Sequence, residues 1–319
     1  MSNKLYASIT NVTRPLDIRF SEAHNDSAPM IIIECESTTL EVGNSISVDL
    51  GYEGDYNTIF NGYVKNISKE ASPPLVTKIT AYGTMIRAVD YFIASLDPNA
   101  PLTYSNISAE DLVGNVLSEA GITNYGYDAT SFIFATTAPM EVNLVAAYDY
   151  CSMIANTLAW HLYADKDGKA WFVDRKPYVM GGDSPSATIV IGDILSATNL
   201  RSERDLRNRI VVYGGEGIYA EASAVSPYLP DGFYKTVVAS AYWIDSQSMA
   251  QQAADYNLTA LNRLTLEVTI TIIGDSSINT REVITVTEAT TGISGNWYVY
   301  SVDHTWGVRG FTTTLILRQ

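Results

Sequence analysis

The sequence contains one β-strand pattern twice, once near each end, and the alternation of residue types slips at the same place in both copies. Aliphatic residues stand at Val64 and Ile67 in the first copy and at Val299 and Val302 in the second. Successive residues of a strand face opposite sides of a sheet, so a step of three puts the second residue on the wrong face unless one residue is extruded. The spacing therefore predicts a β-bulge in each copy.

Each bulged segment lies between two further predicted strands. Alternating apolar residues precede it at 46–52 and 284–286, and a turn containing glycine follows each of these runs. A third strand is expected after each bulge, at 75–82 and at 312–317. Two bulged antiparallel sheets in one chain predict a mainly β fold with two related small antiparallel β-barrel domains, plus a small α/β domain as an α+β insert.

The pattern changes between the two copies, which suggests three domains. A stiff, turn-rich segment at 97–101 marks a boundary. The predicted domains are a first tube-forming β-barrel at 1–97, an inserted α/β domain at 98–188, and a second β-barrel at 189–319. A connecting helix is expected near 248–264 in the last domain.

Three helices are predicted from capping residues and apolar periodicity. Ser108 begins a capping box, Asn143 precedes a second helix, and Ser248 begins another capping box. The second helix has one apolar stripe, formed by Leu144, Ala147, Cys151, Ile154, Ala155 and Leu158. A β-hairpin is expected to follow it, with strands at 160–164 and 170–173.

Composition excludes several classes of protein. The chain of 319 residues is 46% hydrophobic, so it can bury sizeable cores. Its formal charge of -15 repels nucleic-acid phosphates and is also a common means of staying soluble. Cys35 and Cys151 are too few for a disulfide framework and lack CxxC spacing, which indicates a reduced assembly compartment. No signal peptide is expected at the start, and no apolar run approaches the ~20 residues of a membrane span.

The histidines and the acidic turn give little support for metal chemistry. His24, His161 and His304 are far apart in sequence, and none has a partner at metal-ligand spacing. Asp165 to Lys169 resembles the opening of a calcium loop but lacks its later acidic ligands. Structural or surface histidines and an ordinary hairpin turn are therefore predicted.

Other patterns that could carry chemistry are also weak. Glu34 and Glu36 are expected on the same face of one strand, whereas glycosidase carboxylates face each other across a cleft. Gly214, Gly215 and Gly217 follow a strand without a phosphate-loop motif, so a turn is the simpler interpretation. Nucleophile motifs such as GxSxG are absent from the sequence.

A basic cluster near the middle of the chain is interleaved with acids, which indicates ion pairing or a subunit contact. Its arginines are Arg201, Arg204, Arg207 and Arg209. With no motif left to support a reaction, we expect no catalytic, cofactor-binding or metal-binding residues and no bound cofactor. An enzyme is therefore not expected.

Three strings of sequence resemble the phage tail baseplate central hub family, of the late-control gene D type. VDLGYEGDYNTIFNGYVKNI resembles the first barrel of that family, in which a G-x-x-x-x-F-x-G-x-V strand pair recurs. RSERDLRNRIVVYGG resembles the start of its second barrel, and GNWYVYSVDHTWGVRGFTTTLILR resembles its closing strands. The closing motif positions are held by Gly295, Trp297, Val299, Val302, His304, Gly310, Thr313, Leu315 and Leu317.

The resemblance covers most of the chain, with a Trp where the family more often has Tyr, and it implies a structural virion protein. Such a hub is a homotrimer whose six barrels form a pseudo-sixfold ring. The ring joins the hexameric tail tube to the trimeric spike, contacts other baseplate proteins, and lines the DNA channel without specific binding. The insert would lie outside the ring, and an acidic channel lining is expected because like charges prevent DNA from adhering. Assembly would take place in the host cytoplasm, without membrane insertion.

Two other functions stay open from the sequence. A tail-associated peptidoglycan-degrading enzyme is one, because some hub proteins carry a lytic domain. A glycan-binding β-protein is the other, because exposed Trp and Tyr side chains can serve as sugar platforms.

Overall fold

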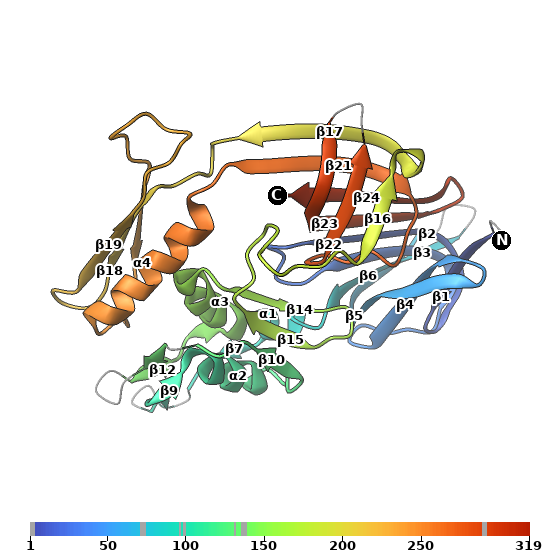
Figure 1. Cartoon of the computed structure of the whole chain (residues 1–319). Helices are drawn as coiled ribbons and strands as arrows, with labels where there is room; N and C mark the ends of the chain where they lie inside the picture. The colour runs from blue at the N-terminus through green and yellow to red at the C-terminus, as the bar shows by residue number, and fades with distance from the viewer. Residues whose placement is uncertain are drawn as a thin grey trace.

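The computed structural model describes residues 4–70, 75–95, 97, 100–130, 132–134, 139–288 and 292–319. Strands dominate it, so the predicted mainly β fold is confirmed. Figure 1 shows strands from both ends of the chain side by side in one part of the molecule, while most of the helices and short strands lie in another. Strands from the N-terminal and C-terminal parts of the sequence therefore come together in space.

The first β-unit is formed by the six N-terminal strands. They are β1 (Leu5–Ile9), β2 (Val12–Ala23), β3 (Met30–Thr38), β4 (Ser45–Tyr52), β5 (Asp55–Glu70) and β6 (Val76–Gly83). Alternate residues of β6 are buried, as expected for strands with one face on a core. The core of this unit includes Ile31, Ile33, Val48, Val64 and Ile79.

The second β-unit is formed by six strands from the C-terminal half. They are β16 (Ala187–Val190), β17 (Ile194–Ser202), β21 (Thr265–Ile273), β22 (Val283–Glu288), β23 (Ile293–Gly307) and β24 (Gly310–Arg318). A short 3-10 helix, η1 (Ile191–Asp193), joins β16 to β17. The core of this unit includes Val268, Ile270, Val286, Val299 and Leu315.

The two β-units share one strand order. The first has the spatial order β1-β4-β5-β6-β3-β2, and the second has the order β16-β22-β23-β24-β21-β17. Taken in chain order, corresponding strands occupy the same places. The residue pairs also correspond, because Ile33 opposite Ile79 in the first unit matches Ile270 opposite Leu315 in the second. In the described residues, neither ladder closes between its first and last strands.

Both predicted β-bulges are confirmed. The register of β5 against β6 shifts between Val64 and Asn66, which extrudes Lys65. The register of β23 against β24 shifts between Val299 and Ser301, which extrudes Tyr300. The shift allows both aliphatic residues of each odd step to face the same core.

A second pair of bulges also matches. The register of β2 against β3 shifts between Pro15 and Asp17, and that of β17 against β21 shifts between Ile194 and Ser196. These shifts align β2 with β17 residue by residue. One pairing differs between the units, because β1 lies antiparallel to β4 whereas β16 lies parallel to β22.

The remaining elements form an α/β region beside the two units. Its helices are α1 (Ile86–Asp90), α2 (Ala109–Glu119), α3 (Ala147–Leu158) and α4 (Gln247–Leu261). Its short strands are β7 (Phe92–Ile93), β8 (Leu102–Tyr104), β9 (Ile107–Ser108), β10 (Tyr125–Tyr127), β11 (Ile133–Phe134), β12 (Met140–Val142), β13 (Val145–Ala146), β14 (His161–Ala164), β15 (Ala170–Val173), β18 (Arg209–Tyr213), β19 (Tyr219–Ser223) and β20 (Thr236–Ser240).

One hydrophobic core joins the middle of the chain to part of the C-terminal half. Residues from α1, α2 and α3 share it with residues of β18, β19 and α4. Phe132 and Phe134 pack against Trp243 with ring centroids 5.6 Å and 5.4 Å apart. The domain boundaries at 97/98 and 188/189 stay predictions, and residues 98 and 99 of the expected junction lie outside the described residues.

One of the three predicted helix caps is confirmed. The Ser108 hydroxyl accepts a hydrogen bond from the Asp111 N–H at 3.2 Å, as a capping residue should. The cap at Asn143 is wrong: β13 pairs with β7 immediately before α3, so this helix begins later, and Leu144 of the expected apolar stripe is exposed. The cap at Ser248 is also wrong, because Ser246 accepts from the Met249 N–H.

The predicted hairpin at 160–173 is confirmed. Strands β14 and β15 pair antiparallel, with His161 opposite Val173. Asp165 Oδ1 accepts from the backbone N–H groups of Asp167 and Lys169, which holds the turn. Within the described residues, no helix has both the length and the apolar character needed to cross a membrane.

Candidate functional site: the junction of the two β-units

The two β-units meet at a strand pair that makes their sheets continuous. Residues Asp17 to Ala23 of β2 lie antiparallel to Ser301 to Gly307 of β23. The first half of β23 pairs with β22 along the same edge. Strand β2 therefore takes over the edge of β23 where β22 ends, and the second unit is completed by a strand from the first (Figure 1).

Apolar packing covers the inner face of this junction. Ile18 and Phe20 from β2 are buried, and so is Val302 from β23. The Phe20 ring stacks on His304 with centroids 5.7 Å apart, and His304 Nδ1 lies 2.9 Å from Thr313 Oγ1. Burial lowers the pKa of His304 to about 4. This histidine is therefore a neutral part of the core.

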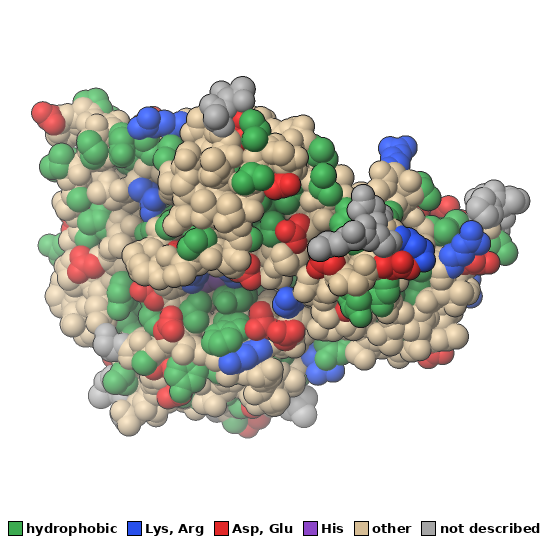
Figure 2. All heavy atoms as spheres, turned by 45° about the vertical axis from the view of Figure 1, so that its right-hand side comes forward, with side chains coloured by type: hydrophobic (Ala, Val, Ile, Leu, Met, Phe, Trp, Pro, Cys, Tyr) green, Lys and Arg blue, Asp and Glu red, His purple; other side chains and the backbone are tan. Residues whose placement is uncertain are grey.

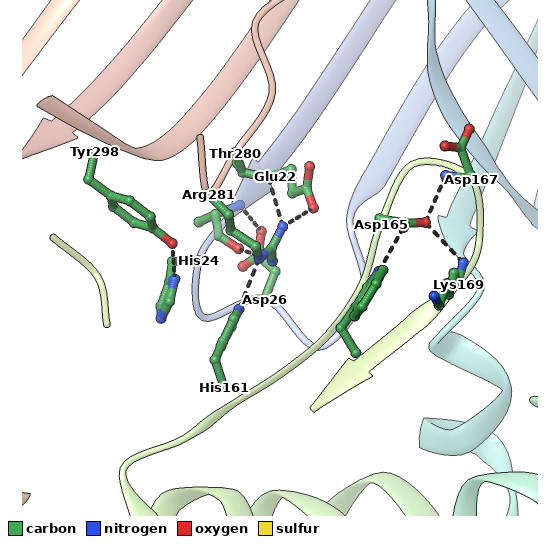
Figure 3. A network of polar contacts seen from close by, with 12 residues as sticks. Glu22, His24, Asp26, His161, Asp165, Asp167, Lys169, Thr280, Arg281 and Tyr298 are labelled. Carbon is green, nitrogen blue, oxygen red and sulfur yellow. Dashed lines mark hydrogen bonds and ion pairs between the residues drawn. The ribbon is translucent and has the colours of Figure 1, made fainter. Parts of the chain in front are cut away.

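Arg281 bridges the junction to the α/β region. Its Nη1 donates to Glu22 Oε1 at 2.6 Å, and its Nε donates to His161 Nε2 at 2.9 Å (Figure 3). The side chains of Arg281 and Glu22 are only 8% and 9% exposed. A buried pair of this kind keeps its attraction because little water screens it. Three segments far apart in sequence are thus held by one guanidinium group.

The two histidines beside Arg281 are neutral. His161 Nε2 accepts a hydrogen bond from Arg281, so this nitrogen carries no proton. The His24 ring stacks on His161 at 3.8 Å, and its Nδ1 lies 2.7 Å from the Tyr298 hydroxyl. Burial, with a further contribution from Arg281, lowers the pKa of His24 to about 3. Burial also lowers the pKa of His161 well below its usual value, and His24 and Arg281 add to the effect.

The backbone at Arg281 has a conformation that usually selects glycine. Its φ is 71°, whereas Gly43, the corresponding residue of the first unit, has a φ of 90°. The correspondence follows from hydrogen bonds, because Gly43 N–H donates to the Val64 carbonyl and Arg281 N–H donates to the Val299 carbonyl, both at 2.8 Å. Arg281 adopts this strained backbone conformation at the position from which its guanidinium group reaches Glu22.

We call the cluster of Glu22, His24, His161 and Arg281 the clamp. Two neutral histidines of lowered pKa lie against a paired arginine, and Ser152 lines a hollow together with both histidines. Across the part of the chain that the structure describes, no three His, Cys, Asp or Glu side chains are grouped so that they could hold a metal ion. The hydrogen bonds of Arg281 to Glu22 and His161 hold three segments of the chain against one another.

The other residues considered from the sequence have structural contacts. Asp165 holds the hairpin turn, and its Oδ2 accepts from the Trp171 indole at 2.8 Å. Gly214 and Gly217 lie in the turn between β18 and β19. Glu36 is exposed and pairs with Arg14 at 3.6 Å. These contacts agree with the structural interpretations of the acidic and glycine-rich patterns.

Two strand edges in the described residues correspond to the paired edges of the junction but have no strand beside them. One is the outer edge of β17, which pairs only with β21, and the other is the second half of β5, which pairs only with β6. Leu195 and Leu200 of β17 are 60% and 53% exposed. An unpaired edge is a template for another strand.

Charged side chains are spread over the surface. On the face shown in Figure 2, acidic groups are scattered among basic and apolar ones and form no single patch. Arg209 of β18 pairs with Glu221 of β19 at 2.8 Å. This face offers no broad basic surface of the kind that grips nucleic acid.

The sequence matches no protein-family model and no curated protein. Solved structures give the informative comparison. The tail protein from Neisseria meningitidis MC58 superposes with a TM-score of 0.72 at 12% identity, over 99% of this chain and 97% of that protein. The chain has the fold of phage tail proteins. The prophage MuSo2 43 kDa tail protein from Shewanella oneidensis gives a TM-score of 0.71 at 12% identity, over 98% of both chains.

This tail-protein fold extends to secretion machinery. An E. coli component of the type VI secretion system, described as structurally similar to the T4 bacteriophage tail proteins gp27 and gp5, has a TM-score of 0.61 at 9% identity. The match covers 98% of this chain and 76% of that protein. The tail-protein fold therefore includes both β-units and the α/β region between them.

Proposed function

We propose that this chain is a structural component of a phage tail baseplate, and specifically its central hub. In this role three copies form a ring of six β-units, with both units of every copy following each other around it. Such a ring presents near-sixfold symmetry to a hexameric tail tube and threefold symmetry to a trimeric spike. The proposed location is the virion, at the baseplate of the tail.

The observation that carries this proposal is the equivalence of the two β-units. They share strand order, two bulges and most of the residue pairing of every strand but the first, and they are already joined edge to edge within the chain. Repetition of one unit lets three chains imitate a sixfold object. The tail-protein fold of the whole chain supports the same role.

The proposed partners follow from that symmetry. One side of the ring would contact the tail tube and the other the spike, while the α/β region would lie outside, next to other baseplate proteins. DNA would pass through the centre without specific binding. The net charge of -15 supports an acidic lining, because like charges keep phosphates from adhering.

The proposed role needs no catalysis. The buried polar cluster around Arg281 holds segments together, and its histidines are neutral. A peptidoglycan turnover assay with the purified chain tests this part of the proposal. Release of muropeptides would contradict a purely structural role, and the expected result is no release above a buffer control.

The assembly itself is tested by the mass of the purified chain in solution. Light scattering across a range of concentrations should give three times the 34.9 kDa of one chain. Added tail tube protein should bind this species and not the monomer. A species that stays monomeric at the highest concentrations would contradict the hub proposal.

A further inference from the structure

The internal junction gives a template for a contact between copies. In the second β-unit, the half of β23 after its bulge is covered by β2. In the first unit, the half of β5 after its bulge corresponds to that segment, but no strand of the described chain covers it. The strand that corresponds to β2 is β17, and its outer edge is also uncovered.

We infer, building on the proposed trimer, that β17 of one copy pairs antiparallel with the second half of β5 of the next copy. The residue pairs of this contact follow from the register of β2 on β23, because β17 corresponds to β2 and β5 corresponds to β23. Ser21 opposite Asp303 becomes Leu200 opposite Ser68 of the next copy. Phe20 opposite His304 becomes Asn199 opposite Lys69. The contact joins two different edges, so it runs head to tail and can close a ring.

The exposed fractions of corresponding side chains are those expected if the first unit lacks a neighbouring strand beside β5. Val302, which lies opposite Glu22 of β2, is 1% exposed, whereas Ile67, at the corresponding place on β5, is only partly buried. Ile18 is fully buried on β2, but most of β17 is exposed in the single chain. Pairing of β17 with β5 would bury these positions and satisfy backbone groups along both edges.

Charge selects the same register. With Leu200 opposite Ser68, the strand pair brings no two like charges directly opposite each other. A slip of two residues would place Arg201 opposite Lys69, which is destabilising in an antiparallel pair. The inferred register therefore avoids a repulsion that a neighbouring register creates.

The turn before β4 adds an electrostatic attraction between the two copies. Glu22 and Asn279 line one hollow at the internal junction. Their counterparts are Arg201 on β17 and Glu41, two residues before Gly43, and both are exposed in the single chain. The inferred contact brings this arginine and this glutamate of the next copy to opposite sides of an equivalent hollow, with the signs of charge that attract.

Disulfide trapping tests the register. His24 N–H donates to the Tyr300 carbonyl at 2.7 Å, which places Ser21 and Asp303 at a non-hydrogen-bonded pair. Such pairs have Cα atoms about 4.5 Å apart, within the range a disulfide can span. Leu200→Cys with Ser68→Cys should therefore form covalent dimers and trimers on mild oxidation. The native Cys35 and Cys151 are buried and do not compete.

A matched pair of variants shows whether the register is specific. Leu200→Cys with Lys69→Cys places the second thiol on the opposite face of the strand, so it should give little intermolecular cross-link. The inferred contact would be overturned if the protein is trimeric by mass but forms no cross-link between Leu200→Cys and Ser68→Cys. Equal cross-linking in the control variant would overturn it too. Neither result would contradict the trimer itself. A chain that stays monomeric would overturn the proposed function as well.

Charge reversal gives a second measurement that does not depend on cysteines. Arg201→Glu should weaken trimer association by about tenfold, and Arg201→Glu with Glu41→Arg should restore most of it. Both residues are exposed, so folding should be unaffected. Equal association of the wild type and Arg201→Glu would count against this contact.

Discussion

The two β-units are built alike but completed differently. In the second unit, the bulged strand β23 has partners along its whole length, because β22 covers one half of an edge and β2 covers the other. In the first unit, the described residues give β5 a partner on that edge only as far as its bulge. Within the described residues, one chain thus contains a paired junction and two unpaired edges at the corresponding positions. The following predictions test how far the units are equivalent.

The largest expected effect is at the clamp, in which Arg281 of the second unit stands where the first unit has Gly43. Glu22→Ala leaves Arg281 buried without its carboxylate, and breaking a buried ion pair in this way costs about 3 to 5 kcal/mol. Urea denaturation should show this loss. Glu36→Ala is the control in the first unit, since the pair of Glu36 with Arg14 is exposed and should contribute less than about 1 kcal/mol.

A double variant separates the ion pair from the packing around it. Arg281→Gly with Glu22→Gln removes both charges and puts glycine where the first unit has Gly43. Removing both partners is much less costly than removing one, so this variant should be more stable than Glu22→Ala. If it is equally unstable, the clamp does not act as a pair.

Acid should weaken the clamp through its histidines. The pKa of His24 is about 3 in the folded chain and near 6.5 when unfolded, so the unfolded state binds more protons between these values. The contribution to stability is complete above pH 6.5 and is lost as the pH falls towards 3, by up to about 1.4 kcal/mol per pH unit for this group. Between pH 7 and 5 the loss should reach about 2 kcal/mol, measured by denaturation at each pH.

A variant isolates this histidine from the many carboxylates that also titrate in acid. His24→Gln removes the titrating group and keeps a hydrogen-bonding side chain near Tyr298. The fall in stability between pH 7 and 5 should become shallower by the amount assigned to His24. An unchanged slope would show that His24 already titrates normally in the folded chain.

Shortening the aliphatic residue that follows each bulge should lower the free energy of unfolding by different amounts in a dilute, monomeric sample. Val302→Ala removes buried methyl groups beneath β2 and should cost about 2 kcal/mol, whereas Ile67→Ala should cost less than about 1 kcal/mol. At concentrations where copies associate, Ile67→Ala should also weaken the trimer. Equal costs in the monomer would mean that another part of the chain covers β5.

The smallest expected effect is at the turn that the units share. Gly43→Ala adds a side chain at a φ of 90°, which costs about 1 kcal/mol. No atom lies within 4 Å of where its Cβ would be, so the cost should be conformational only. Denaturation of this variant measures the strain that Arg281 accepts at the corresponding position. A stabilised Gly43→Ala chain would contradict the assigned strain.

The repeated strands could be predicted from the sequence because their side chains alternate between the two faces of a sheet. The odd step from Val64 to Ile67 can be satisfied only by an extruded residue if both face one core, and the same reasoning holds for Val299 and Val302. The same three-residue spacing predicted the helix cap correctly at Ser108 but placed the other capping box at Ser248, two residues after the true cap at Ser246. Local pattern and short-range hydrogen bonding thus predicted much of the two β-units.

Other features depend on contacts between distant residues and could not be read from local patterns. Strand β17 is rich in polar and exposed residues, so its periodicity is weak without the neighbour it would need. His24, His161 and Arg281 are far apart in sequence and form the clamp only in the folded chain. The one local signal was indirect, since Arg281 stands where the repeat has Gly43.

Electron cryomicroscopy of the purified assembly tests the central claim most directly. The account predicts a ring of six similar β-units from three chains, in which β17 of each copy continues the sheet of the next through β5. The α/β regions should project from the outside of this ring. A reconstruction in which the two units of a chain occupy unrelated positions, or in which β17 and β5 lie apart, would contradict it.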